Sequence, residues 1–227
     1  MSGGLGQPRV HLRLADSTNE RARDLAGRGA PHGTLVTALE QTAGRGRQGR
    51  TWTAPPGRAI LCSVVVRDPP RLLPLAAGVA VAEVAGEQAS LKWPNDVLVD
   101  GRKVAGILAE GRPQEGWAVV GMGINVALRA EDFPSELRGI AGSLGLEPEA
   151  IEPTLERLMD GLGRWIAAPG EHVLEAVRDR DALLGRSVRW AGGAGRGAGV
   201  DQEGRLLVLT DGGEVALEAG EVHLVRA

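Results

Sequence analysis

Residues 40–67 read EQTAGRGRQGRTWTAPPGRAILCSVVVR, and this stretch decides between two classes of fold. Its three glycines match the G-x-G-x-x-G fingerprint of dinucleotide-binding folds, and Asp68 follows at the distance expected for a ribose-binding carboxylate. That fold requires a helix to begin at the glycines, so that the helix N-terminus receives the pyrophosphate. Here a Pro-Pro-Gly break at 55–57 and an apolar, β-branched strand over 59–67 follow instead. The order of strand, loop and strand therefore excludes a Rossmann fold.

The loop between these strands combines glycines with three arginines, Arg45, Arg47 and Arg50. Glycine lets backbone N–H groups approach a ligand closely. The planar guanidinium of arginine suits phosphate and carboxylate oxygens. Such a loop could close as a lid over an anion that carries a flat organic group. An RNA-binding arginine–glycine segment is the alternative at this point.

Composition limits the possible partners. The chain has 227 residues and a net charge of −3, whereas a protein that coats nucleic acid normally has a strongly basic face. Cys62 is the only cysteine, which excludes an internal disulfide and a cysteine metal cluster. The N-terminus has no apolar signal core, and no apolar run is long enough to span a membrane. We therefore expect a cytoplasmic protein.

The order of the expected elements indicates an α+β fold, in which a mixed or antiparallel sheet with flanking helices precedes a small SH3-like β-barrel. We expect two domains, residues 1–184 and 185–227. The segment AGGAGRGA at 191–198 is poor in side chains and is expected to be a loose loop, and the Gly-rich residues 1–7 are expected to be disordered. Strands are expected over 10–14, 34–39, 59–67, 91–93, 97–99, 104–110, 117–126, 187–190, 199–200, 206–209, 215–217 and 222–225, and helices over 17–26, 72–87, 149–166 and 171–184.

The first expected helix begins with several polar residues. Ser17 and Glu20 have the spacing of a capping box, which alone explains Ser17. Thr18 and Asn19 then remain as polar groups at a helix N-terminus, which is a good place to hold a polar ligand.

Two lysines, Lys92 and Lys103, stand out among 26 basic residues that are otherwise arginine. Lysine supplies a compact point charge that arginine cannot copy. Lys92 opens the dense motif KWPND and could neutralise a carboxylate and a phosphate as they meet. Asn95 and Asp96 could orient Lys92 or hold Mg²⁺. A polar corner between a strand and a turn is the alternative.

Glycines also interrupt two expected strands. Gly106 falls in the strand over 104–110, and Gly121 and Gly123 fall in the next one, although glycine normally weakens a sheet. One such glycine would indicate a β-bulge, but three on neighbouring strands favour a flat apolar ligand against the backbone. Asn125 follows with an amide suited to a base edge or a sugar.

Several common enzyme sites are absent from the sequence. It contains no G-x-x-x-x-G-K-[ST] phosphate loop and no G-x-S-x-G elbow, and its four histidines lack metal-ligand spacing. Cys62 lies in an apolar run without an evident base, which favours a core cysteine.

Taken together and in this order, the motifs resemble those of the biotin protein ligases, or biotin–[acetyl-CoA-carboxylase] ligases, over essentially the whole chain. The matching elements are Ser17-Thr18-Asn19, Gln41, GRGRQGR at 44–50 with Trp52, KWPND at 92–96, KVAGILAE at 103–110 and GMGIN at 121–125. The resemblance implies a class II synthetase-like catalytic domain followed by the small C-terminal domain of that family.

The resemblance also implies two half-reactions. The carboxylate of biotin attacks the α-phosphate of MgATP, which gives biotinyl-5′-AMP and pyrophosphate. A lysine ε-amine of the biotin carboxyl carrier protein then attacks the mixed anhydride and releases AMP. No covalent enzyme intermediate is involved, so catalysis would come from positioning and charge stabilisation.

Site roles follow from the same resemblance. Lys92 is expected to be the principal catalytic group, assisted by Arg47, and Mg²⁺ is expected with the ATP, without assigned protein ligands. The expected biotin-binding residues are Ser17, Thr18, Asn19, Gln41, Gly44, Arg45, Lys92, Gly106 and Gly123. The expected ATP-binding residues are Arg47, Arg50, Trp52, Lys92, Asn95 and Asn125.

The expected partner is the biotin carboxyl carrier protein, and a homodimer remains open. The catalytic domain starts by residue 10, without the winged helix-turn-helix of bifunctional relatives, so no contact with DNA is expected, nor any with a membrane. A lipoate–protein ligase, which shares the chemistry, is the nearest alternative. From a different class, an RNA-binding module is disfavoured by the net acidity and by the lack of stacking aromatics near the loop other than Trp52.

Overall fold

A computed structural model describes residues 4–225 and contains two sheets. The larger sheet has seven strands in the order β1-β2-β3-β7-β6-β5-β4. Its β1–β2 pair is parallel and the remaining pairs are antiparallel, which makes it the mixed sheet expected from the sequence. The strands are β1 (Arg9–Ala15), β2 (Leu35–Gln41), β3 (Ala59–Arg67), β4 (Ser90–Lys92), β5 (Asp96–Val99), β6 (Arg102–Arg112) and β7 (Trp117–Asn125).

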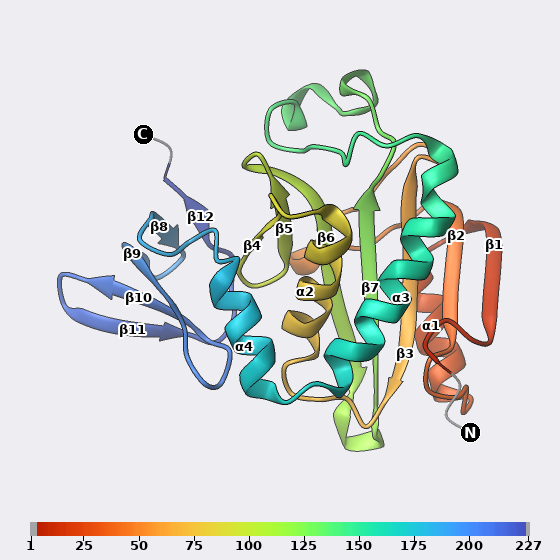
Figure 1. The fold of residues 1–227 in the computed structure, drawn as a ribbon, viewed down its shortest axis with the longest axis horizontal. Coiled ribbons are helices and arrows are strands. Elements are labelled where there is room, and N and C mark those ends of the chain that lie inside the picture. Colours follow the sequence, from red (N-terminus) through yellow and green to blue (C-terminus); the bar gives the residue numbers. More distant parts are fainter. Residues whose placement is uncertain (1–3, 226–227) are drawn as a thin grey trace.

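Helices cover both faces of this sheet (Figure 1). On β3, Val65 packs with Ala22 of α1, whereas the alternate residues Val64 and Val66 join a core cluster with α2 and α3. This alternation is why β3 reads as a continuous apolar run. The helices are α1 (Thr18–Gly27), α2 (Leu73–Ala85), α3 (Ile151–Ala167) and α4 (Gly170–Asp179), and short 3-10 turns span Arg47–Gly49 (η1), Pro113–Glu115 (η2), Ala130–Asp132 (η3), Ser135–Leu137 (η4) and Pro148–Ala150 (η5).

The second sheet is antiparallel and lies beyond α4, with the strand order β11-β10-β9-β8-β12 (Figure 1). Val200, Leu206 and Val208 from this sheet share one core cluster with Val177 of α4. The Trp93 indole Nε1 also donates to the Gly204 carbonyl at 3.0 Å, which joins the KWPND segment to the smaller sheet. The strands are β8 (Ser187–Trp190), β9 (Gly193–Val200), β10 (Leu206–Thr210), β11 (Gly213–Leu217) and β12 (His223–Leu224).

The expected loose loop at 191–198 is a strand for most of its length. Residues 193–200 form β9, paired with β8 on one side and β10 on the other. A Cβ atom at Gly195 would collide with the Leu209 carbonyl, and one at Gly197 with the Leu183 carbonyl. The sequence is poor in side chains here because neighbouring backbone occupies their place.

Two smaller expectations are also wrong. Residues 4–7 are not disordered, because the Gly6 N–H donates to the Gly33 carbonyl at 2.9 Å and Leu5 packs on the core; residues 1–3 lie outside the described part of the chain. Ser17 occupies the N-cap position of α1, but its side chain makes no capping hydrogen bond. Glu20 pairs instead with Arg45 of the arginine–glycine loop.

Gly197→Ala is expected to lower the free energy of unfolding by about 1–3 kcal/mol, because the added methyl overpacks β9 against Leu183. Gly212→Ala, in the turn of the same sheet, is a matched control whose Cβ meets nothing closer than the Thr210 hydroxyl at 3.7 Å. Urea denaturation of both variants measures the difference. Equal stabilities would contradict the close approach of Leu183 to β9.

Candidate functional site

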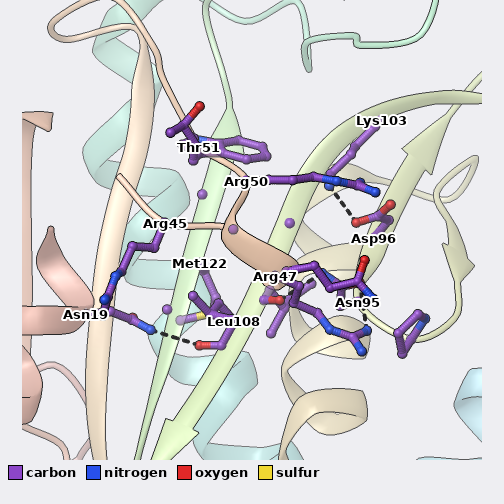
Figure 2. A pocket seen from close by; sticks show the side chains of 18 of the residues that line it. Asn19, Arg45, Arg47, Arg50, Thr51, Asn95, Asp96, Lys103, Leu108 and Met122 are labelled. Atoms are coloured by element: carbon purple, nitrogen blue, oxygen red, sulfur yellow. Dashed lines mark hydrogen bonds and ion pairs between the residues drawn. The ribbon is translucent and has the colours of Figure 1, made fainter. Parts of the chain in front are cut away.

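A pocket lies on the α1 side of the seven-stranded sheet, at the start of that helix and beneath the arginine–glycine loop (Figure 2). Its walls come from α1, the 45–52 loop, β3 to β7 and the turn before β12. Of the residues expected at the site, those that line the pocket are Ser17, Thr18, Asn19, Gln41, Arg45, Arg47, Arg50, Trp52, Lys92, Asn95, Gly106 and Gly123.

Two expected site residues, Gly44 and Asn125, do not line the pocket. The Gly44 carbonyl accepts the Trp52 N–H at 2.9 Å and so closes the base of the loop, where a Cβ would collide with the Trp52 carbonyl. Asn125 is buried, and its Nδ2 donates to the Gly142 carbonyl at 2.9 Å. In this arrangement both residues shape the surroundings of the pocket.

The three loop arginines, which the sequence presents as one group, point to different partners (Figure 2). Arg45 pairs with Glu20 of α1 at 2.8 Å. Arg47 donates from Nη1 to Asn95 Oδ1 at 3.3 Å, and Arg50 pairs with Glu221 in the turn before β12. The tip of the loop is a tight turn in which Gln48 has a positive φ of 55° and Gly49 one of 75°. This turn lies between Arg47 and Arg50 and lets the two side chains reach different partners.

A carboxylate shared by two lysines lies beneath Arg47 and Arg50. Asp96 is 2.6 Å from the Lys103 ammonium and 3.5 Å from the Lys92 ammonium. Lys103 also lies over the Trp52 ring, 5.6 Å from its centroid, a cation–π geometry. Lys103 was singled out by its rarity but was not assigned to the site, and it lines the pocket together with Asp96.

Burial changes the acid–base character of these cations. It lowers the pKa of Lys92 below its ordinary value, opposed by the attraction of Asp96 and reinforced by the repulsion of Lys103. Burial likewise lowers the pKa of Arg47, opposed by Asp96. Both charged forms are therefore costly until an anion reaches them.

The floor of the pocket is backbone exposed by glycine. Trp52 lies so close to Gly106 and Gly123 that a Cβ at Gly123 would overlap its indole ring. The Trp52 indole itself covers these two glycines, so the expectation of a flat ligand on them stays a prediction. Gly121 also lines the pocket, and its Cβ position is occupied by the Asn19 side-chain amide, which gives a second reason for glycine there.

Three polar residues at or next to the pocket were given no role from the sequence, although Glu110 ends the KVAGILAE motif. Ser63 is fully buried on β3 and hydrogen-bonds to both Thr18 and Asn19. Glu110, on β6, accepts a hydrogen bond from Asn19 at 2.9 Å. Glu221 belongs to the far end of the chain. Each depends on a long-range contact that local patterns do not encode.

Cys62 is a core residue, 1% exposed, and burial raises the pKa of its thiol to about 12. Among residues 4–225, no three His, Cys, Asp or Glu side chains group closely enough to hold a metal ion. No helix in the described part of the chain is long and apolar enough to cross a membrane.

Comparisons with known proteins identify related chains. The biotin–[acetyl-CoA-carboxylase] ligase of Mycobacterium tuberculosis is 34% identical over 98% of this chain and 92% of its own length. The bifunctional ligase/repressor BirA of Bacillus subtilis is 33% identical over 97% of this chain and 75% of its own length. Among solved structures, biotin protein ligase from Aquifex aeolicus in complex with biotin and ATP matches with a TM-score of 0.79 and 30% identity, covering 97% of this chain and all of that one.

A family profile gives the same assignment. The profile described as Biotin/lipoate A/B protein ligase family matches residues 12–126, which carry the pocket strands, α1 and the arginine–glycine loop. The chain therefore belongs to the Biotin/lipoate A/B protein ligase family.

Proposed function

We propose that this chain activates biotin with ATP to form biotinyl-5′-AMP and transfers the biotinyl group to a lysine of the biotin carboxyl carrier protein. One observation carries the proposal: a single pocket joins a neutral, hydrogen-bonding end at Thr18 and Gln41 to a cationic end at Lys92 and Lys103. Biotin has the matching polarity, with a neutral ureido head and a carboxylate tail. The relatives whose names specify biotin, the Mycobacterium tuberculosis ligase and the Aquifex aeolicus structure, favour this substrate over lipoate and over RNA.

In the first half-reaction, an oxygen of the biotin carboxylate attacks the α-phosphorus of ATP, and the bond between the α- and β-phosphates breaks to release pyrophosphate. Two anions must approach each other, so cations at the meeting point lower the barrier. Lys92 and Lys103 are placed for this role in our proposal, with Arg47 and Arg50 above them on the phosphates. Trp52 would lie against the adenylate.

In the second half-reaction, the neutral ε-amine of the carrier lysine attacks the acyl carbon. The bond to the phosphate oxygen breaks, AMP leaves, an amide forms and the amine loses its proton. Mg²⁺ prefers phosphate oxygens and water. The pocket carboxylates Asp96 and Glu221 are already paired with cations, so we assign the ion to the nucleotide and no dedicated cage to the chain.

We place the reaction in the cytoplasm, where ATP and reduced thiols are available. The lone, buried Cys62 supports a reducing compartment.

The proposed function predicts ATP–pyrophosphate exchange that depends on biotin. A second assay, with a carrier domain added, should show one biotinylated lysine and stoichiometric AMP. Lipoate in place of biotin is the specificity control. Exchange that occurs with lipoate but not with biotin, or exchange that needs neither acid, would refute the proposed function.

Lys92→Ala is expected to cost about 2.7–4 kcal/mol of transition-state stabilisation, the range for a lost oxyanion-type donor. Lys103→Ala is expected to be comparably impaired, because Lys103 shares Asp96 with Lys92 and lies over the Trp52 ring. Arg112→Ala removes an exposed cation at the end of β6 and is the control. Single-turnover adenylate formation measures each change. Near-normal turnover in Lys92→Ala would refute its catalytic role.

The lowered pKa of Lys92 predicts a pH dependence. Because the pKa lies below that of free lysine, kcat/KM for biotin should fall on the alkaline side as Lys92 loses its proton. Asp96 raises this pKa, so Asp96→Asn should move the alkaline limb to lower pH. Lys103→Gln removes a neighbouring charge and should move it to higher pH. Shifts in the same direction for both variants would contradict the assignment.

A further inference from the structure

We propose that Ser63 and Glu110 are positioning residues that set the direction of the hydrogen bonds at the neutral end of the pocket. Through Asn19 they make the Thr18 hydroxyl present an acceptor, while Gln41 presents donors. The inference rests on the proposed function, since it concerns how the biotin head is recognised. It adds two residues that do not themselves line the pocket.

The orientation of the Asn19 side-chain amide fixes the direction of the first hydrogen bond in this series. Its Nδ2 lies 3.2 Å from the Leu108 carbonyl (Figure 2) and 2.9 Å from a carboxylate oxygen of Glu110. A carbonyl and an ionised carboxylate only accept hydrogen bonds, so the amide nitrogen must face them. The other carboxylate oxygen of Glu110 lies 3.7 Å from Arg23 and 3.9 Å from Arg45. Asn19 Oδ1 is therefore turned toward Ser63.

The Ser63 hydroxyl then determines whether the Thr18 hydroxyl donates or accepts a hydrogen bond. Its hydroxyl lies 2.7 Å from Asn19 Oδ1, which can only accept, so the single Ser63 proton is donated there. The Thr18 and Ser63 hydroxyl oxygens lie 2.8 Å apart, a separation that needs one proton between them. With the Ser63 proton on Asn19, we infer that Thr18 supplies it, in preference to its longer contact of 3.2 Å with Gln41 Oε1. Thr18 keeps a free lone pair and offers no hydrogen to the pocket.

Gln41 is oriented by the same logic. The backbone N–H of Thr18 donates to Gln41 Oε1 at 2.7 Å, so the carboxamide oxygen is occupied and its NH₂ group is the side available to a ligand. The pocket end then offers an acceptor at Thr18 and donors at Gln41. A ureido group has the complementary pattern, with N–H donors flanking one carbonyl acceptor, whereas a dithiolane ring has neither.

Burial makes this arrangement hard to reverse. Thr18 and Asn19 are no more than 5% exposed and Ser63 is fully buried, so water cannot readily supply a missing partner. Gly121 lies opposite Ser63 in the β3–β7 pair, and its missing side chain leaves the space that the Asn19 amide fills. The direction of the hydrogen bonds is thus fixed by residues of four strands (β2, β3, β6 and β7) and of the start of α1.

The test measures binding of biotin and of two analogues, by calorimetry without ATP. In each analogue a different ureido N–H is replaced by a ring oxygen. The wild-type chain should bind one analogue at least about tenfold more weakly than biotin, because that oxygen faces the Thr18 acceptor. In Ser63→Ala, the Thr18 hydroxyl is free to turn and donate to the ring oxygen of that analogue. The ratio of the analogue's Kd to the Kd of biotin should therefore fall toward one, while the Kd of biotin itself should rise about tenfold.

Matched variants separate positioning from structure. Thr37→Val removes another buried hydroxyl, bonded to Arg9 and His11 on the opposite face of the sheet, and should leave the ratio unchanged. Glu110→Gln retains an acceptor for Asn19 and should keep most of the discrimination that Glu110→Ala loses. In adenylation kinetics, Ser63→Ala should raise KM for biotin and leave KM for ATP unchanged.

An unchanged ratio in Ser63→Ala, or an equal fall in Thr37→Val, would overturn the inference. Failure of the proposed function gives a different result. A chain that binds biotin and discriminates the analogues but forms no adenylate would contradict the reaction and support the positioning role. A chain that does not bind biotin would overturn both.

Discussion

At the tip of the arginine–glycine loop, the described residues place four cations and only two carboxylates, Asp96 and Glu221, in the pocket. The rest of the pocket depends on this excess of positive charge. Lys92 and Lys103 share Asp96, and Arg50 pairs with Glu221. Within residues 4–225, Arg47 hydrogen-bonds to the neutral amide of Asn95 and feels the charge of Asp96 without an ion pair of its own. Partly buried cations without full compensation are costly, so the site gains most when an anion enters. This accounts for a basic pocket on a protein whose net charge is negative.

At the opposite end of the pocket, the direction of the hydrogen bonds, and not charge, decides which ligand fits. Its buried hydroxyls and amides are joined from Gln41 through Thr18, Ser63 and Asn19 to Glu110. Between the two ends, glycines on β6 and β7 leave a flat floor. A substrate with a neutral polar head and an acidic tail satisfies both ends at once. Positioning then brings its carboxylate to the cations without a nucleophilic side chain.

The smaller sheet is part of this site. The Trp93 indole is bonded to Gly204, and the β4 residue Leu91 hydrogen-bonds through both its N–H and its carbonyl to the segment that leads into β8. Glu221 reaches the loop through Arg50. The strand nearest α4, β9, is glycine-rich because the chain passes closely on both sides of it. The C-terminal part of the chain therefore holds the KWPND segment through Gly204 and the arginine–glycine loop through Glu221.

Local patterns in the sequence determined the fold class and the residues that gather at the pocket. The Pro-Pro-Gly break and the strand after it excluded a dinucleotide fold, and the rarity of lysine marked both Lys92 and Lys103. These signals survive in the sequence because turns, strands and isolated charges depend on near neighbours. Only the tertiary structure decided that the loop arginines have separate partners, that Gly121 makes room for Asn19 and that Ser63 directs Thr18. Those features arise where side chains from distant segments meet, and their partners are set by packing across the sheet.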